Sequence, residues 1–353
     1  MAVPDLIVAG AGMAGLSAAA HARQRGAQVA LLEKGDRAGG SMLLSSGVIW
    51  RHRDFDRFRQ ECPGGDEALQ RMVFDRLDAG LEWLESLGAR PLERETGNPL
   101  TSGVRFDTRA LTEALLGAAG GARLGEPLTD VPRDAPVVLA TGGFQAGREL
   151  VEQYVTPRAA LMLRAAPWSS GDGMRLGLAA GGALSVGMDE FYGRNMPAPP
   201  ARVGDADFVR AAQLYATHAV VRNRDGEVYE PRTWSEIYVV QWTARQPGAR
   251  AWYEVPDENL AIRVRDRTVG DMVETARAAG APCERSSGAT AIEVVAGITT
   301  TLGGLRIEAD ARVAPGVYAA GADAGGIATG GYASGLAAAL VWGRIAAESA
   351  LAG

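Results

Sequence analysis

The chain has 353 residues, of which 47% are hydrophobic and 22% charged, a composition typical of a globular protein with a substantial core. Its formal net charge of −6 and the lack of a basic run argue against nucleic acid or an anionic membrane surface as the main partner. Two cysteines cannot form a disulfide framework, a structural zinc site or an iron–sulfur cluster, and the three histidines show no metal-ligand spacing. We therefore expect no metal, and electron transfer only through an organic cofactor or a partner.

The sequence shows no apolar stretch that we expect to be long enough to span a bilayer. The apolar run over 6–20 lacks a basic segment before it and is interrupted by three glycines, so it is not expected to be a signal peptide. We therefore expect a cytoplasmic protein.

The first thirty-three residues have the pattern strand, glycine-rich turn, helix, strand. An apolar run leads into Gly10, Gly12 and Gly15, at the spacing G-x-G-x-x-G, and a helix is expected over 13–25. The first glycine permits the tight turn, the second lets backbone approach a pyrophosphate, and the third lets the helix lie close to the sheet. Glu33 ends the second apolar run, where a carboxylate can accept hydrogen bonds from ribose hydroxyls. This motif predicts a dinucleotide and by itself permits either NAD or FAD.

The next segment contains a small-residue loop and a series of helices. The Gly- and Ser-rich stretch 39–47 could lie against a flat ligand or be an ordinary turn. Apolar residues at three- and four-residue steps predict a helix over 68–87, and a shorter helix is expected over 108–116. The buried strand expected over 136–140 runs into Thr141, Gly142 and Gly143, and another helix is expected to begin near Asp172.

The pattern changes between residues 183 and 297, where tyrosine, tryptophan and arginine become frequent. We expect an inserted second domain there, with short strands over 236–240 and 251–255 and a helix over 271–279. Glycine-rich α/β character then returns, with a strand over 316–320, glycine-rich loops over 321–335 and a small-residue helix over 336–350. One domain split by an insertion explains why glycine-rich loops occur at both ends of the chain.

These stretches together resemble the fumarate reductase/succinate dehydrogenase flavoprotein superfamily, particularly the branch with 3-ketosteroid dehydrogenases and tricarballylate dehydrogenase. The matching stretches are 10–15 with Glu33, 39–41, 46–50, 140–144, 171–173, 301–305, 318–321 and 342–346. They lie at both ends of the chain and leave the middle weakly matched. The segments over 122–137 and 279–301 are shorter than the family pattern, so this is a trimmed version of the fold.

The resemblance implies an α/β fold: a Rossmann-like FAD-binding domain of the glutathione reductase GxGxxG type, interrupted by an inserted α+β substrate cap domain. It implies an FAD-binding domain over 1–182 and 298–353, a cap over 183–297, and a non-covalent FAD, since no histidine lies in the 39–46 loop. Asp323 stands one place after the usual carboxylate position and is expected to reach the ribityl hydroxyls. The expected cofactor-binding residues are Gly10, Gly12, Met13, Ala14, Gly15, Glu33, Lys34, Gly39, Gly40, Ser41, Ser45, Ser46, Gly47, Ala140, Thr141, Gly142, Gly321, Asp323, Ser334, Gly335 and Leu336.

Several positions depart from the fumarate reductase pattern. The residues that grip a dicarboxylate in that enzyme correspond here to Thr299 and Tyr332, which makes a dicarboxylate substrate doubtful. Val228 replaces an arginine of the cap, and Arg232 stands where a proton-relay glutamate is common. The proton relay of fumarate reductase is therefore not intact.

Tyr332 before a glycine-rich helix start resembles instead the ketosteroid dehydrogenase pattern, in which a tyrosine hydroxyl and a glycine N–H polarise a carbonyl. The prediction is an FAD-dependent oxidoreductase that dehydrogenates or reduces a carbon–carbon bond next to a carbonyl of a small molecule, with an unidentified electron acceptor or donor. Two alternatives stay open: an oxidase or hydroxylase that uses oxygen, and a non-catalytic flavin-binding or electron-transfer subunit. The candidate catalytic residues are Tyr332, Gly335, Tyr192, Arg194, Tyr229 and Arg232.

Overall fold

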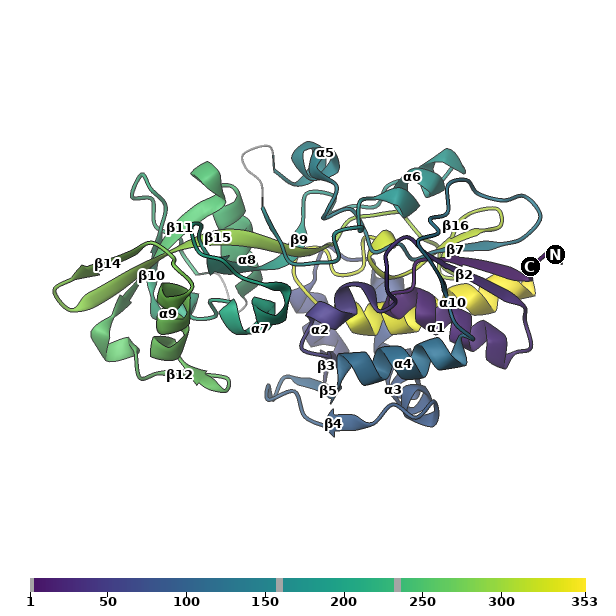
Figure 1. Cartoon of the computed structure of the whole chain (residues 1–353), viewed down its shortest axis with the longest axis horizontal. Helices are drawn as coiled ribbons and strands as arrows, with labels where there is room; N and C mark the ends of the chain where they lie inside the picture. Colours follow the sequence, from purple (N-terminus) through teal and green to yellow (C-terminus); the bar gives the residue numbers. More distant parts are fainter. Residues whose placement is uncertain (1–2, 157–160, 232–235) are drawn as a thin grey trace. The chain divides into compact units, whose positions relative to one another are not determined.

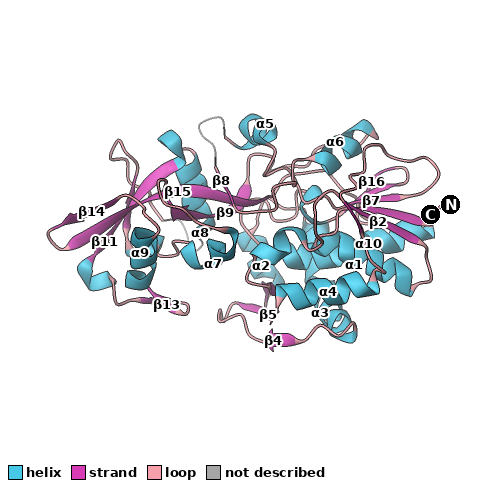
Figure 2. Cartoon of the chain, in the orientation of Figure 1, coloured by secondary structure: helices cyan, strands magenta, loops and turns pink. Residues whose placement is uncertain are grey.

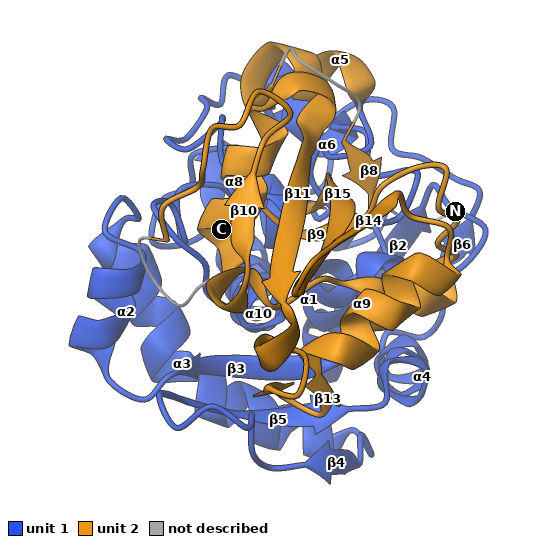
Figure 3. Ribbon diagram, turned by 90° about the vertical axis from the view of Figure 1, so that its left-hand side faces the viewer, with its two compact units in different colours: residues 1–147, 165–190, 300–353 blue, residues 148–164, 191–299 orange. Residues whose placement is uncertain are grey.

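A computed structural model describes residues 3–156, 161–231 and 236–353 (Figure 1). The chain forms two compact units, coloured separately in Figure 3: the first holds residues 1–147, 165–190 and 300–353, and the second holds 148–164 and 191–299. This division differs from the expected single insertion over 183–297. Residues 162–163 belong to the second unit because they pair with β15 in its sheet. Residues 183–190 stay in the first unit, where the carbonyl of Glu190 accepts the N–H of Leu302.

The first unit is built on a six-stranded sheet with the order β16-β17-β7-β1-β2-β6 (Figure 1). Four of its pairings, β17 with β7, β7 with β1, β1 with β2 and β2 with β6, are parallel, and β16 is antiparallel to β17. The inner strands are short apolar runs, as expected for a sheet covered on both faces. Their bounds are β1 Leu6–Ala9, β2 Val29–Glu33, β6 Arg123–Leu124, β7 Val137–Leu139, β16 Arg312–Ala314 and β17 Val317–Ala319.

Small residues let the first and last helices of this unit pack closely. A Cβ added at Gly343 of α10 would lie 2.3 Å from the carbonyl oxygen of Ala14 in α1. Real Cβ contacts are never that short, so the glycine is required for this approach. Close packing of α1 against α10 explains why both helices are rich in glycine and alanine. The bounds of these helices are α1 Met13–Gln24, α4 Thr108–Ala118, α6 Asp172–Ala179 and α10 Gly335–Ala352.

A second, three-stranded antiparallel sheet with the order β3-β5-β4 completes the first unit. Asp54 and Asp66 cap the two helices associated with it, because their carboxylates accept backbone N–H groups of the first turns. The longer of these helices carries the apolar periodicity that the sequence showed. The bounds are β3 Val48–His52, β4 Pro91–Glu93, β5 Thr101–Phe106, α2 Phe55–Glu61 and α3 Glu67–Ser86.

The helix α10 is the one helix among the described residues that is long and apolar enough to cross a membrane. The expectation that no apolar stretch has that length was therefore wrong. More than half of the helix is buried, and it packs against α1 and α3 of the first unit. A buried helix in the core of a protein can have the same length and apolar composition as a membrane-spanning helix.

The second unit is built on a sheet with the order β10-β11-β15-β14, and β8 and β9 also pair with the long strand β15 (Figure 2). Strand β11 alternates between buried and half-buried positions, and Tyr215, Tyr253 and Ile292 are fully buried in the core of the unit. The bounds are β8 Met162–Leu163, β9 Phe191–Pro197, β10 Val220–Arg222, β11 Arg250–Pro256, β14 Cys283–Ser286 and β15 Ala289–Thr301, with a separate hairpin of β12 Arg263–Val264 and β13 Arg267–Thr268.

The helices of this unit include one that the sequence analysis predicted wrongly. Residues 236–240, expected as a strand, form the start of helix α8, because burial of Ile237, Val239 and Val240 outweighs the strand preference of a β-branched and aromatic run. The predicted strand over 251–255 and helix over 271–279 are confirmed. The bounds are α5 Arg148–Leu150, α7 Phe208–Ala211, α8 Glu236–Ala244 and α9 Val269–Ala278.

We predict that Gly343→Ala lowers the free energy of unfolding by about 1–3 kcal/mol, because the added methyl group would overlap the backbone of α1. Urea-induced unfolding followed by circular dichroism would measure the change. Gly117→Ala in α4 is the matched control: a Cβ there meets no heavy atom within 4 Å, so alanine should stabilise the helix by about 0.5–1 kcal/mol. Equal effects of the two variants would contradict the packing described here.

Candidate cofactor and active site

The glycine-rich loops follow the carboxyl ends of parallel strands, which meet at one edge of the sheet. A Cβ at Gly10 would lie 2.1 Å from the carbonyl oxygen of Ala140, and one at Gly321 would lie 2.9 Å from Cβ of Ala14. The N–H of Gly39 donates to the carbonyl of Ala11 at 2.7 Å. The structure thus brings together four loops that are up to about three hundred residues apart in sequence.

The start of α1 leaves its backbone accessible. Gly12 is the N-cap residue, and no side chain of the described residues accepts the N–H groups of the first turn. A Cβ at Gly12 would meet no heavy atom within 4 Å, so open space lies beside this backbone, whereas one at Gly15 would lie 1.8 Å from the carbonyl oxygen of Gly10. Met13 and Ala14 are buried behind the turn. A helix N-terminus with unpaired N–H groups and room in front of it is suited to a pyrophosphate.

Glu33 is buried, and its carboxylate accepts two backbone hydrogen bonds. Oε2 accepts from the N–H of Ala11 at 2.7 Å, and Oε1 accepts from the N–H of Gly35 at 2.6 Å. The side chain therefore holds the glycine turn against the end of β2. Each carboxylate oxygen has a second lone pair. Its interaction with a ribose stays a prediction, and the structure adds a role in shaping the turn.

Lys34 and Trp168 lie close to Glu33 at the end of β2. The ammonium group of Lys34 lies 2.8 Å from a carboxylate oxygen of Asp172 and 2.8 Å from the hydroxyl of Ser170. These contacts occupy Lys34 with the start of α6, so its cofactor role stays a prediction. A Cβ added at Gly35 would lie 2.4 Å from the ring atom Cε2 of Trp168, so the indole packs directly against this glycine. The sequence analysis missed this tryptophan, because nothing in its spacing links it to Glu33.

Asp323 is completely buried. Its carboxylate accepts the backbone N–H of Thr141 and, at 3.0 Å, that of Gly143, and the hydroxyl of Thr141 donates to it at 3.2 Å. Burial raises the pKa of Asp323, although the hydrogen bonds from Thr141 and Gly143 oppose that shift. The carboxylate binds the glycine turn after β7, and its contact with ribityl hydroxyls stays a prediction.

The 39–47 loop begins as the short 3₁₀ helix η1 Gly40–Leu44. Gly39 and Gly47 have positive φ angles of 108° and 72°, which other residues adopt at a cost. The hydroxyl of Ser41 accepts the N–H of Ala166 at 3.0 Å, and that of Ser45 donates to the carbonyl of Met42 at 2.8 Å, while Ser46 is exposed. Gly40 packs against Gly12, since a Cβ there would lie 3.3 Å from its Cα. This loop therefore lies directly beside the glycine turn after β1.

Tyr332 and Gly335 lie together at the start of α10. The N–H of Gly335 is 3.4 Å from the hydroxyl oxygen of Tyr332, to which it donates, so the two groups expected to share a carbonyl do meet. Gly335 is exposed and Tyr332 is half-buried, with its ring 6.0 Å from that of Trp50 in an edge-to-face arrangement. Ser334 caps the helix by accepting the N–H of Ala337, and Leu336 is half-buried in the first turn.

The loop before Tyr332 is held by buried groups of the first unit. The side-chain amide of Gln70, which is fully buried, donates to the carbonyls of Cys62 and Ile327 at 2.9 and 2.8 Å. A carboxylate oxygen of Glu190 accepts the N–H of Gly330 at 2.7 Å. Burial raises the pKa of the Cys62 thiol to about 12, which keeps it un-ionised.

The comparisons with known proteins agree with this geometry. The model of the FAD binding domain family matches residues 5–114 and 56–335. The chain belongs to this FAD-binding family. Its cofactor is FAD, as the resemblance implied.

Relatives of this FAD-binding protein include vinyl phenol reductase from Lactiplantibacillus plantarum, 25% identical over 252 residues, which are 55% of this chain and 49% of the relative. The 3-oxo-5-alpha-steroid 4-dehydrogenase of Comamonas testosteroni is 36% identical over 102 residues, 24% of this chain and 19% of the relative. The chain thus aligns with about half or less of the length of these curated relatives.

Solved structures share the fold of this FAD-binding protein. An open flavocytochrome c3 fumarate reductase has a TM-score of 0.74 at 20% identity, covering 99% of this chain and 78% of the other. A 3-ketosteroid Δ4-(5α)-dehydrogenase from Rhodococcus jostii RHA1, in complex with 4-androstene-3,17-dione, has a TM-score of 0.73 at 20% identity, covering 99% and 96%. These matches confirm the predicted fold class and the expected resemblance.

The candidate residues of the second unit have different surroundings. Tyr192 and Arg194 lie two positions apart on β9 and so point to the same face, with the guanidinium 4.8 Å from the ring centre. Tyr229 is 9% exposed, and its ring centre lies 5.6 Å from that of Trp242. Tyr229 therefore belongs to the hydrophobic core of the unit, whereas Tyr192 and Arg194 do not belong to that core cluster. Arg232 lies outside the described residues. The catalytic roles of all four stay predictions.

The structure adds charged residues to the surroundings of Arg194 that the sequence analysis missed. Arg164, which is 7% exposed, donates to the hydroxyl of Thr299 at 2.8 Å and to the carbonyl of Phe208 at 3.0 Å. Burial lowers the pKa of Arg164 to about 10 and raises the pKa of Glu236 to about 7. No local pattern could reveal these residues, because they come from distant parts of the chain.

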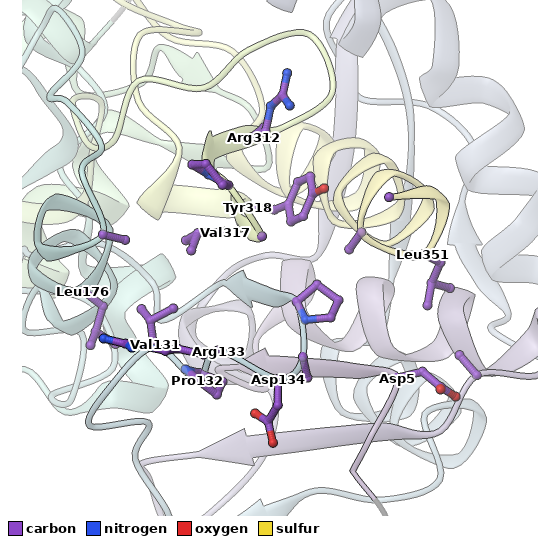
Figure 4. A pocket seen from close by; sticks show the side chains of 18 of the residues that line it. Asp5, Val131, Pro132, Arg133, Asp134, Leu176, Arg312, Val317, Tyr318 and Leu351 are labelled. Carbon is purple, nitrogen blue, oxygen red and sulfur yellow. The ribbon is translucent and has the colours of Figure 1, made fainter.

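A groove of about 1480 Å³ lies elsewhere on the first unit (Figure 4). Several of its residues precede or begin parallel strands, for example Asp5 before β1, Asp134 before β7 and Val317 in β17. It therefore lies at the amino ends of the strands, away from the glycine loops. Ligands of open α/β sheets bind at the carboxyl ends, so we do not assign the groove to FAD.

We predict that Glu33→Gln weakens FAD binding about tenfold, because the charge-assisted acceptor for two N–H groups is lost and the glycine turn loosens. Fluorescence titration of the flavin-free protein with FAD would measure the dissociation constant. Glu85→Gln, which changes a half-buried carboxylate paired with Arg94 at the end of α3, is the control and should leave the constant unchanged. An unchanged constant for Glu33→Gln would contradict the role of this carboxylate.

We predict that His52 makes the first unit less stable in acid. Its ring is 2% exposed, neither nitrogen has a hydrogen-bond partner among the described residues, and burial lowers its pKa from 6.5, with a smaller opposing effect of Glu61. The unfolded chain therefore takes up the proton at higher pH than the folded one, so the free energy of unfolding falls as pH drops below about 6.5. Urea unfolding at pH 7 and pH 5 should show a smaller fall for His52→Phe than for the parent protein.

Proposed function

We propose that this chain is an FAD-dependent oxidoreductase that acts on a carbon–carbon bond next to a carbonyl of a small molecule. The observation that carries the proposal is the pairing of Tyr332 with the N–H of Gly335 at a helix start in an FAD-binding fold. Two relatives are named for reduction of a vinyl phenol and dehydrogenation of a 3-oxo steroid. Both names support chemistry at a carbon–carbon bond, and the second also supports a substrate that carries a carbonyl.

The tyrosine has the chemistry to polarise a carbonyl. Its phenol O–H would donate to the substrate oxygen, and the N–H of Gly335, which donates to the phenol oxygen, would strengthen that donor by polarising it. Negative charge that develops on the oxygen would be stabilised by this donor and by the positive end of α10. The bound flavin supplies acceptance or donation of a hydride.

The α-proton of the substrate also requires a partner. Tyr192 and Arg194 are our candidates, because they share one face of β9 and neither lies in the hydrophobic core cluster around Tyr253. We propose that the second unit serves as the substrate cap, that the protein acts in the cytoplasm, and that a further electron donor or acceptor completes the cycle.

We predict that Tyr332→Phe lowers kcat/KM about a hundredfold while FAD stays bound, because one oxyanion donor is lost. The measurement is reduction of the bound flavin, or its reoxidation by cyclic enones, under anaerobic conditions in a stopped-flow spectrometer. Tyr318→Phe is the matched control, since that hydroxyl lies 3.4 Å from the carbonyl of Ser349 at the far end of α10. It should keep the parental rate.

Full turnover by Tyr332→Phe would contradict the carbonyl role. Failure of every carbonyl compound to exchange electrons with the flavin would contradict the reaction class and favour an electron-transfer subunit. Rapid reoxidation in air with release of hydrogen peroxide would instead favour an oxidase.

A further inference from the structure

Three arginines of the second unit lie near one another around β9. Arg164 follows β8, Arg194 lies in the middle of β9, and Arg265 stands in the turn between β12 and β13. The charge of Arg194 lowers the pKa of both Arg164 and Arg265, after the larger effect of burial on each. Arg265 has a φ of 60°, a left-handed conformation unusual for arginine. The chain therefore brings like charges together at some energetic cost.

No carboxylate compensates these charges directly. Among the described residues, none of the three arginines has an Asp or Glu oxygen within 4.0 Å, although nineteen other ion pairs are formed. The residues outside the described ranges contain no Asp or Glu in the sequence. Glu236 is the acid whose charge acts on both Arg194 and Arg265, and its raised pKa leaves it partly neutral near pH 7.

The surrounding backbone makes room for Arg164. A Cβ at Gly297 of β15 would lie 2.6 Å from Cδ of Arg164 and 2.9 Å from the carbonyl oxygen of Arg194. The absence of a side chain at this position lets the arginine lie across the strand. Its Nη1 and Nη2 atoms donate to Thr299 and Phe208, while Nε is buried without a partner among the described residues. The side chain is thus held in one place with donor capacity left over.

We propose that Arg164, Arg194 and Arg265 form a binding site for the carboxylate of a small organic substrate. Arg164 is buried, Arg194 is half-buried and Arg265 is exposed, and none of them has a carboxylate of a described residue in ion-pair contact. Such cations are stabilised by an anionic ligand, and a guanidinium binds a planar carboxylate through paired hydrogen bonds. The rings of Tyr192 and Phe208, 4.8 and 5.9 Å from the guanidinium carbons of Arg194 and Arg164, add apolar surface for an organic group.

This inference rests on the proposed function and narrows it, because it makes the substrate a carboxylate-bearing compound. The site is not the pair of positions that grip a dicarboxylate in fumarate reductase, which are Thr299 and Tyr332 here. Thr299 instead accepts a hydrogen bond from Arg164. The arginines come from three other segments of the second unit.

The test is isothermal titration calorimetry of the FAD-loaded full chain with hexanoate and with hexanamide, which have the same length and differ in charge. We expect hexanoate to bind at least about tenfold more tightly, since charge-assisted hydrogen bonds are stronger than neutral ones. The preference should shrink between 20 and 300 mM NaCl, because salt screens partly exposed charges.

Two variants locate the effect. Arg194→Gln and Arg164→Gln should each weaken hexanoate binding about tenfold and leave hexanamide binding unchanged. Arg194 is half-buried and its side chain makes one long hydrogen bond, to the carbonyl of Gly193 at 3.4 Å, so its variant should fold even if that of Arg164 does not. Arg277→Gln, which changes an exposed arginine paired with Glu274 on α9, is the control and should bind hexanoate normally.

Equal affinities for hexanoate and hexanamide, or no heat from hexanoate at 50 mM, would overturn the proposal. Unchanged hexanoate binding by Arg194→Gln would do the same, and tighter binding of inorganic phosphate than of hexanoate would contradict the carboxylate assignment. The calorimetry needs no turnover, so it separates the two hypotheses. A chain that binds hexanoate as described but reduces no carbonyl compound would contradict only the proposed function.

Discussion

The buried carboxylate of Asp323 is the interaction on which the cofactor site depends. It accepts two backbone N–H groups and one hydroxyl from Thr141 and Gly143, and it has no exposure to water. Its own carbonyl accepts the N–H of Leu305 at 2.7 Å, so the same residue also fixes the glycine-rich segment before β16. Burying a carboxylate is costly unless its hydrogen bonds are satisfied, and here three donors from the neighbouring turn satisfy it.

The rest of the first unit follows from this connection. The segment after β17 is held next to the turn after β7, and the turn after β1 lies against both through Gly10 and Gly321. The five parallel strands place their carboxyl ends at one edge, so the loops meet without any long connection across the sheet. We therefore expect FAD binding to use backbone groups and small residues far more than specific side chains, in agreement with the open space beside the helix start at Gly12.

The two units contribute different chemistry. The first presents a tyrosine and a helix N-terminus, groups that donate hydrogen bonds to an oxygen that gains negative charge. The second presents arginines after β8, on β9 and in the β12–β13 turn, with a glutamate whose pKa is raised to about 7 by burial. One set of groups suits a carbonyl oxygen and the other suits a carboxylate.

The sequence by itself determined the cofactor motif, the fold class and most elements of the first unit. Gly10, Gly12, Gly15 and Glu33 lie within one short segment, where spacing and backbone requirements are local. The tertiary structure alone decided the helix at 236–244, the burial of Asp323 against Thr141 and the grouping of Arg164 with Arg194. Local preference favoured a strand for residues 236–240, but burial of their apolar side chains decided the outcome. A carboxylate finds its donors, and an arginine loses its water, only when distant segments pack together, and that information is absent from the order of residues along any one segment.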